Sequence, residues 1–285
     1  MLNALLKSDD RKKNFYIITL FFFSIFFNQY YGNKGICPID SFFTFNSAYD
    51  ILNGYYPFKD YWTITGPFLS LTQAVFFKIF GTSWSTYVLQ ASVFNFIISF
   101  STFYVLFKLR LNINFCFIYA LSVAVLANPS AGSPYVDHQS AILSIISIFC
   151  FILAIKSNKK IYWFFLPILL GISFLTKQAP TAHIFIIIFF LSSVYFVNNF
   201  NKKNFLFGLF GSVIVIGTFC LIMILGKISF ISFYQQYILF PMSLGSDRLE
   251  FLFPLEFSRV FLRFKLIHLA SFLLIFISFK KIIKN

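Results

Sequence analysis

Acidic residues are scarce in this chain, and their positions are the first indication of chemistry. Only nine Asp and Glu occur among 285 residues, against 23 Lys and Arg. Three of the nine, Asp40, Asp50 and Asp60, fall within residues 37–68, "CPIDSFFTFNSAYDILNGYYPFKDYWTITGPF". A carboxylate within hydrogen-bond reach of a hydroxyl can take its proton as that hydroxyl attacks another group. The cluster therefore marks a place where a general base could work.

Each of these acids also has a structural interpretation. Asp40 opens a predicted amphipathic helix over 39–53 and could be its N-cap, which stabilises a helix by about 1 kcal/mol. Asp50 could be a solvated helix residue, and Asp60 a turn residue paired with Lys59 or with the lipid surface. At 3.6 residues per turn, Asp40 and Asp50 lie about 80° apart around the helix, so their spacing predicts no metal pair.

One cation has a position suited to an anionic group, and a second lies in a predicted outer loop. Lys177 follows a short apolar segment and precedes "QAP", and Arg248 lies in "GSDRLE". Arg can hold a phosphate with two donors at once, and Lys acts as a point charge. Lys177 could instead extend to lipid headgroups, and Arg248 could pair with Asp247 or Glu250.

A fourth acid, Asp137, precedes an apolar run in "SPYVDHQ" and could cap the helix that follows. His138 and His183 have no ligand partner at a suitable spacing, so we interpret both as structural.

The elements that position these residues follow from the composition. The chain is 59% hydrophobic and 11% charged, with 46 Phe, whereas a soluble domain is about half apolar and about a quarter charged. Apolar runs long enough to cross a bilayer contain roughly 17 to 25 residues. We expect an all-α polytopic membrane protein with about eight spans, near 14–31, 84–107, 112–128, 139–155, 161–176, 180–198, 204–225 and 264–279.

The basic residues predict how the chain threads the membrane. They cluster at 7–13, 108–110, 156–160, 201–203 and 280–284, and positive loops stay in the cytoplasm. Eight spans with both termini inside place every cluster on that side, if 66–81 lies on the outer surface without crossing. The net charge of +14 is then a topology signal, and no nucleic-acid partner is expected.

This threading leaves three loops outside, 32–83, 129–138 and 226–263, and long ordered loops usually carry function. In the first loop, the helix over 39–53 would rest its apolar face on the membrane. Gly54 suits the C-cap of that helix, and Pro57 prevents its continuation.

The ordered motifs resemble the GT-C superfamily of polytopic glycosyltransferases, closest to protein O-mannosyltransferases and bacterial aminoarabinose transferases. The resemblance rests on Asp near the start of an outer helix, "L-x-G-x-x-P-[FY]-x-D" and "GPF" in the first loop. "SPYVDHQ", "GISFLTKQAP" and "ISFYQQYILFPMSLGSDRLE" resemble later family segments in the same order. Together they cover nearly the whole chain, 1–285, as one membrane-embedded catalytic module.

The resemblance implies transfer of a sugar from a polyprenyl-phosphate donor to a hydroxyl or phosphate of a lipid, glycan or protein acceptor. It gives Asp40 the role of catalytic base, and Lys177 and Arg248 that of binding the donor phosphate, with Asp60, Asp137 and Tyr135 in support. A divalent cation, Mg²⁺ or Mn²⁺, could be held by Asp40 and Asp137; no other cofactor is implied. It also implies the plasma membrane of a bacterium, with the chemistry at the outer face.

The sequence departs from the family in two ways. Gly66-Pro67 stands where many members have Lys-Pro or Pro-Pro, and the chain is shorter than most members, so a membrane partner could supply C-terminal parts. Two alternatives stay open: a transporter or flippase of lipid-linked sugars, and a non-catalytic membrane subunit. Transporters place charges near mid-membrane, whereas here the predicted spans are almost free of acids and seven of the nine acids lie in the predicted outer loops.

Overall fold

The structure, a computed structural model, describes all residues except 1, 36–39, 128–131, 245–260, 263–264 and 284–285; the side chains of 2–10, 40–41 and 278–283 are likewise not described. Within this part of the chain every regular element is a helix, as predicted. The elements are α1 (Leu2–Gly32), α2 (Asp40–Leu52), α3 (Pro67–Phe80), α4 (Trp84–Lys108), α5 (Ile113–Leu126), α6 (Val136–Ser157), α7 (Lys160–Phe174), α8 (Thr181–Asn198), α9 (Lys202–Leu225), α10 (Phe230–Phe233), η1 (Tyr234–Leu239) and α12 (Lys265–Ile283).

Four helices in the described residues are long and apolar enough to cross a membrane: α4, α6, α8 and α9. They match four of the eight predicted spans. Residues 113–126, 160–174 and 265–277 form shorter apolar helices, and the predicted span at 14–31 lies within α1. The protein is therefore an all-helical membrane protein with four candidate spans.

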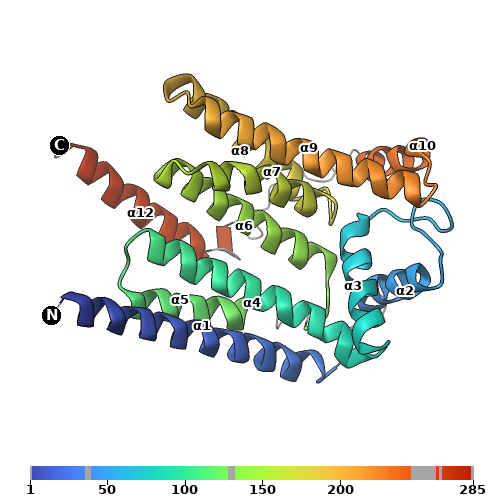
Figure 1. Cartoon of the computed structure of the whole chain (residues 1–285), viewed down its shortest axis with the longest axis horizontal. Helices are drawn as coiled ribbons and strands as arrows, with labels where there is room; N and C mark the ends of the chain where they lie inside the picture. Colours follow the sequence, from blue (N-terminus) through green and yellow to red (C-terminus); the bar gives the residue numbers. More distant parts are fainter. Residues whose placement is uncertain (1, 36–39, 128–131, 245–260, 263–264, 284–285) are drawn as a thin grey trace. The chain divides into compact units, whose positions relative to one another are not determined.

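The chain forms two compact units, Met1–Ile238 and Leu239–Asn285. In the first unit α4, α6, α7 and α9 lie side by side, each packed on the next, and α1 and α5 pack on α4 (Figure 1). The helices α2 and α3 pack on each other, and α3 also packs on α4 near the end where α4 begins (Figure 1). The short helix α3 thus lies beside the start of α4.

Polar side chains join the helices inside the first unit. On α4, the amide of Asn95 donates to Ser24 O at 3.3 Å and to Ala124 O at 2.8 Å, linking α1, α4 and α5. Asn28 donates to Ser92 Oγ at 3.0 Å and to Gly132 O at 3.1 Å. Interhelical hydrogen bonds and small residues hold helices together where water and its hydrophobic effect are absent. Sequence periodicity indicated the apolar runs but not these contacts.

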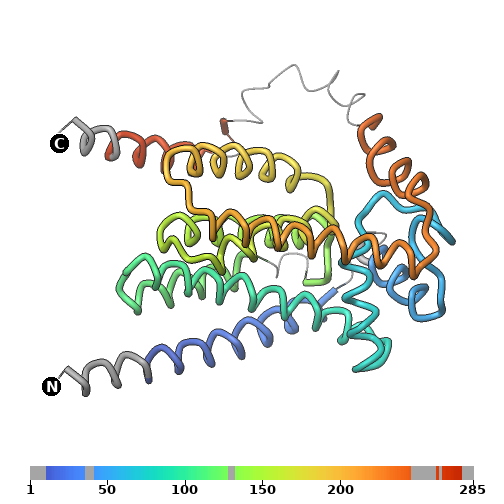
Figure 2. Tube along the Cα trace, turned by 45° about the horizontal axis from the view of Figure 1, so that its top comes forward, coloured from blue at the N-terminus to red at the C-terminus, as the bar shows by residue number. Residues whose placement is uncertain are grey.

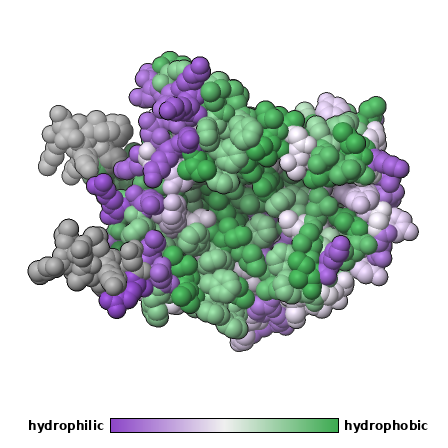
Figure 3. Space-filling view, in the orientation of Figure 1, coloured by the Kyte–Doolittle hydropathy of each residue, from purple (hydrophilic) through white to green (hydrophobic). Residues whose placement is uncertain are grey.

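The basic clusters of the first unit meet at one end of the bundle. Lys108 and Arg110 line the same cavity as Lys156 and Lys159. Asn204, beside the cluster at 201–203, donates to Asn158 Oδ1 at 2.5 Å. At the other end of the bundle, the segment that follows α7 meets the loop before α3, the start of α3, and η1 through the contacts described below; Figure 2 shows the trace of these segments. Hydrophobic side chains cover most of the viewed face, and hydrophilic ones gather towards its margins (Figure 3).

Candidate functional site

Two of the predicted site residues pair directly. Lys177, in the turn after α7, donates from Nζ to Oδ1 of Asp137 in the first turn of α6. The Lys177 side chain is 32% exposed and that of Asp137 45%. A carboxylate near a helix N-terminus is favoured by the helix dipole. Tyr135 is the N-cap residue of α6, so Asp137 serves as the partner of Lys177 and not as the cap.

Hydroxyl groups hold the helices beneath this ion pair. Thr181 on α8 lies 3.0 Å from Ser140 Oγ, 3.2 Å from Ser144 Oγ and 2.8 Å from Ser173 Oγ. Ser140 Oγ also donates to Lys177 O at 3.3 Å. All four hydroxyl residues are buried. Because they join α6, α7 and α8, they fix the backbone that carries both members of the ion pair.

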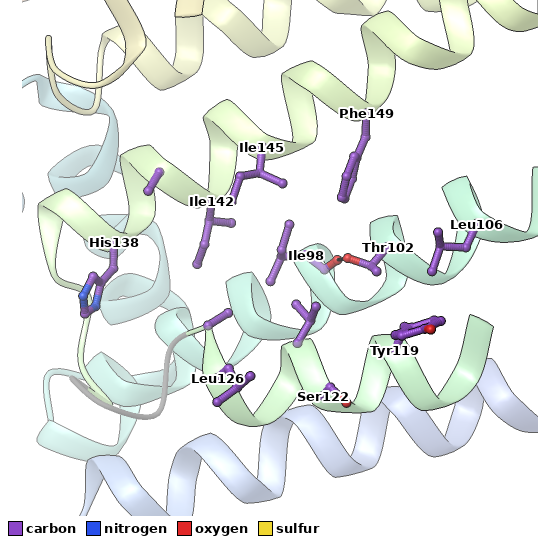
Figure 4. Close-up of a pocket in the computed structure, with 13 residues that line it drawn as sticks. Ile98, Thr102, Leu106, Tyr119, Ser122, Leu126, His138, Ile142, Ile145 and Phe149 are labelled. Carbon is purple, nitrogen blue, oxygen red and sulfur yellow. Dashed lines mark hydrogen bonds between the residues drawn. The ribbon is translucent and has the colours of Figure 1, made fainter. Parts of the chain in front are cut away.

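His138, the residue that follows Asp137, lines an apolar cavity. It has a volume of about 590 Å³, lies between α4, α5 and α6, and is lined by apolar side chains such as Ile98, Ile142 and Phe149. Figure 4 shows His138 at one end of the cavity. The side chain of Tyr135 packs edge-on against His138, with ring centroids 5.3 Å apart. The residue that follows Asp137 in the sequence thus lines the apolar cavity.

Two side chains next to Asp137 have polar atoms without a partner among the described residues. They are Nδ1 of His138 and both amide atoms of the fully buried Gln139. A buried polar group left unsatisfied costs about 1–3 kcal/mol, so such groups generally meet water or a ligand. These unpartnered polar atoms belong to residues in the first turn of α6, next to Asp137 in the sequence.

Two glutamines join three segments that are far apart in the sequence. Gln178 donates to Ile64 O at 3.0 Å and to Tyr237 O at 2.5 Å. Gln236 accepts from Thr63 N at 3.1 Å and donates to Phe58 O at 3.4 Å. Segments 58–64, 176–178 and 236–237 are therefore held together; we call this set of contacts the glutamine clasp.

The first loop also touches the end of α7 through its backbone. Gly66 N donates to Thr176 O at 3.0 Å, and Phe68 N donates to Leu175 O at 3.1 Å. A Cβ on Gly66 would lie 1.8 Å from Leu175 O, far inside a van der Waals contact. The absence of a side chain at position 66 is thus what lets the loop approach the segment that carries Lys177.

The remaining first-loop motif residues have structural roles. Gly54 has φ +85° and ends α2 in the left-handed region, as predicted. Phe58, 2% exposed and at φ +67°, packs with Tyr237 and Met223. Asp60 accepts from Tyr56 N at 2.8 Å and lies 3.7 Å from Lys59 Nζ. Asp60 is therefore a turn residue, as its structural interpretation predicted, and any support of catalysis by it stays a prediction.

Asp40 begins α2, within one residue of the predicted start of that helix. Its side chain lies outside the described residues, and so does Arg248 entirely. The predicted apolar face of α2 is exposed, including Phe42, Phe43 and Tyr49, whereas Ser47 and Ala48 are buried. An exposed aromatic face is what a helix resting on a membrane surface presents.

Sequence reasoning missed the clasp residues Gln178 and Gln236. Both stand next to hydrophobic or aromatic stretches, in "LTKQAP" and "FYQQYIL", and a polar side chain in such a setting needs a hydrogen-bond partner. The need for such a partner is the feature of the sequence that could have identified both glutamines. Among the residues whose side chains are described, no three His, Cys, Asp or Glu gather as a metal site.

No family model matches this chain, and no curated protein shows significant similarity to it.

Proposed function

We propose that this protein is a membrane glycosyltransferase that moves a sugar from a polyprenyl-phosphate donor to an acceptor hydroxyl or phosphate. The observation that supports it best is the Lys177–Asp137 pair at the start of α6, where the next residue, His138, lines an apolar cavity of about 590 Å³. An amphiphilic donor has a charged head and a hydrocarbon tail. The pair offers charge for the head and the cavity offers apolar walls for part of the tail.

Lys177 would hold the donor phosphate as the glycosidic bond breaks. An ammonium group has three donors, so Lys177 can keep Asp137 and still face a phosphate oxygen. The leaving phosphate gains charge in the transition state, and a fixed cation stabilises that change. Asp137 then orients Lys177, while Tyr135 packs against His138 beside it. Arg248 would supply a second cation to the same phosphate.

Asp40 would take the proton of the attacking hydroxyl. This role rests on the resemblance of its position, at the start of the first outer helix, to the family's catalytic acid. A phosphate leaving group is a stable anion and needs no general acid, so one base is sufficient for the transfer. A divalent cation held by Asp40 and Asp137 would supply further positive charge to the phosphate, if the enzyme uses one.

In the arrangement we propose, the chain crosses the bacterial plasma membrane eight times, with both termini in the cytoplasm. Residues 32–83 then lie outside. The α3 helix has 14 residues and spans about 21 Å, less than the roughly 30 Å of a hydrocarbon core. Single cysteines at Asn33 and Thr82, in a chain without its native cysteines, should both react with a membrane-impermeant thiol reagent. Protection at 82 with labelling at 33 would refute this topology.

Purified protein in lipid vesicles, given a panel of polyprenyl-phosphate sugars, should release polyprenyl phosphate and form a glycosylated acceptor. A transporter of lipid-linked sugars would instead move the donor between leaflets without breaking its phosphate–sugar bond. A non-catalytic subunit would do neither alone. Release of polyprenyl phosphate therefore separates the proposal from both alternatives.

A further inference from the structure

The end of the bundle remote from Lys177 holds a second cavity, and this one is polar. It has a volume of about 330 Å³, and four of its lining residues are basic: Lys108, Arg110, Lys156 and Lys159. Residues 137 and 156 are separated by about 29 Å along α6, from 1.5 Å per residue. This is close to the roughly 30 Å thickness of a bilayer core, so the cavity is distinct from the candidate site.

Four cations around one cavity repel each other unless an anion lies among them. The ion pairs Lys59–Asp60 and Lys177–Asp137 do not involve these four residues. The segments that supply them, "KLR" at 108–110 and "KSNKK" at 156–160, contain no acid. Positive charge here is thus uncompensated by the surrounding described side chains.

One of the four basic residues also has an unusual backbone conformation. Arg110 has φ +67°, a region that residues other than glycine rarely adopt. Such strain is a reason to look for function at a site. Tyr162 also lines the cavity, and its hydroxyl lies 2.9 Å from that of Tyr104 on α4. The buried Leu153 completes an apolar side.

We infer that this cavity binds the phosphate headgroup of an anionic phospholipid in the membrane leaflet at that end. The cations would meet the phosphate, and Leu153 and Tyr162 would face the glycerol and the first methylenes of the acyl chains. Basic pockets between membrane helices recognise lipid headgroups in this way. A soluble phosphate would satisfy the cations but would leave the apolar wall without a partner.

The test is lipid retention by the full chain in detergent. Incubated with phosphatidylglycerol, the wild-type protein should keep one such lipid in native mass spectrometry and should not keep phosphatidylcholine. The double variant Arg110→Gln, Lys156→Gln should bind about 30-fold more weakly, because each basic residue near an anionic lipid contributes about a fivefold factor.

The matched control is Lys202→Gln, Lys203→Gln, which removes the same charge from exposed residues of a neighbouring basic cluster. It should retain the lipid. Equal loss in both double variants would overturn a specific site in favour of general surface attraction. Displacement of the lipid by excess inorganic phosphate would overturn the lipid assignment in favour of a free anion. Equal unfolding temperatures in phosphatidylcholine would show that both variants fold, and this readout does not depend on sugar transfer.

Discussion

Lys177 and Asp137 are forty residues apart in the sequence and form an ion pair because α6 and α7 are antiparallel neighbours. Both side chains are partly exposed, and ion pairs in that setting stabilise a fold by about 1 kcal/mol or less. The pair therefore contributes little to folding. The pair places a cation at the end of the bundle where α6 begins and α7 ends.

Replacing Lys177 by Met should lower sugar transfer by about 100-fold or more, the usual effect of losing a group that stabilises transition-state charge. The matched control is Lys59→Met, because Lys59 is also an ion-paired lysine and lies in a turn. Initial rates in vesicles, at equal protein levels, make the comparison. Equal rates for both variants would reduce Lys177 to a surface residue.

Asp40→Asn should lower transfer by roughly 100-fold, the scale of general-base loss, with normal expression. Asparagine has a similar size and can also cap a helix, so the cap interpretation predicts near-normal activity. Asp50→Asn, on the same helix, is the control and should have little effect, and Asp60→Asn should have an intermediate one. Wild-type transfer by Asp40→Asn would remove Asp40 from the mechanism.

Gln236→Leu should lower the free energy of unfolding by about 1–3 kcal/mol, because it leaves the buried Thr63 N–H without its acceptor. Gln235→Leu changes the exposed neighbour and should be close to neutral. Thermal unfolding in one detergent provides the measurement. Similar losses in the two variants would show that the glutamine clasp contributes no more than its surroundings.

The phenol of Tyr61 should lose its proton at a higher pH than an ordinary tyrosine. Burial raises the pKa of its phenol to about 12, above the ordinary value of 10.0, with an opposing hydrogen bond from Ser47 and smaller effects of Asp50 and Asp60. The folded state then holds this proton more tightly than the unfolded state. The stability it contributes is complete below about pH 10 and is lost as the pH rises towards 12.

The difference in phenolate absorbance between wild type and Tyr61→Phe isolates this group from the other tyrosines. A midpoint near pH 12 is expected. A midpoint near pH 10 would mean that the loop carrying Tyr61 opens freely to water, and that its contact with Ser47 is not maintained.

Local pattern was a good guide to local structure. The predicted helix over 39–53 is observed as Asp40–Leu52, and its predicted end at Gly54 has the expected positive φ. These features depend on neighbouring residues only. The predicted runs at 112–128 and 161–176 are helical but shorter, Ile113–Leu126 and Lys160–Phe174, because hydropathy continues into the turns that follow a helix.

Contacts between distant segments could not be obtained in this way. Gln236 meets Thr63 across 173 positions, and no spacing rule connects them. The same limit applies to the pairing of Lys177 with Asp137, although both residues were singled out by type and position. Which face of α2 packs was likewise hidden, since Ser47 and Ala48 are buried with Phe45 packed beside them, whereas Phe42, Phe43 and Tyr49 are exposed.

The close approach of Gly66 to Leu175 restricts which sequences this backbone can accept. A Lys or Pro at 66 would place its Cβ against the Leu175 carbonyl. A positive side chain therefore cannot be introduced at 66 by one substitution without moving the end of α7. A cation near this contact therefore has to come from another position of the chain, and Lys177 lies two residues beyond the carbonyl that Gly66 approaches.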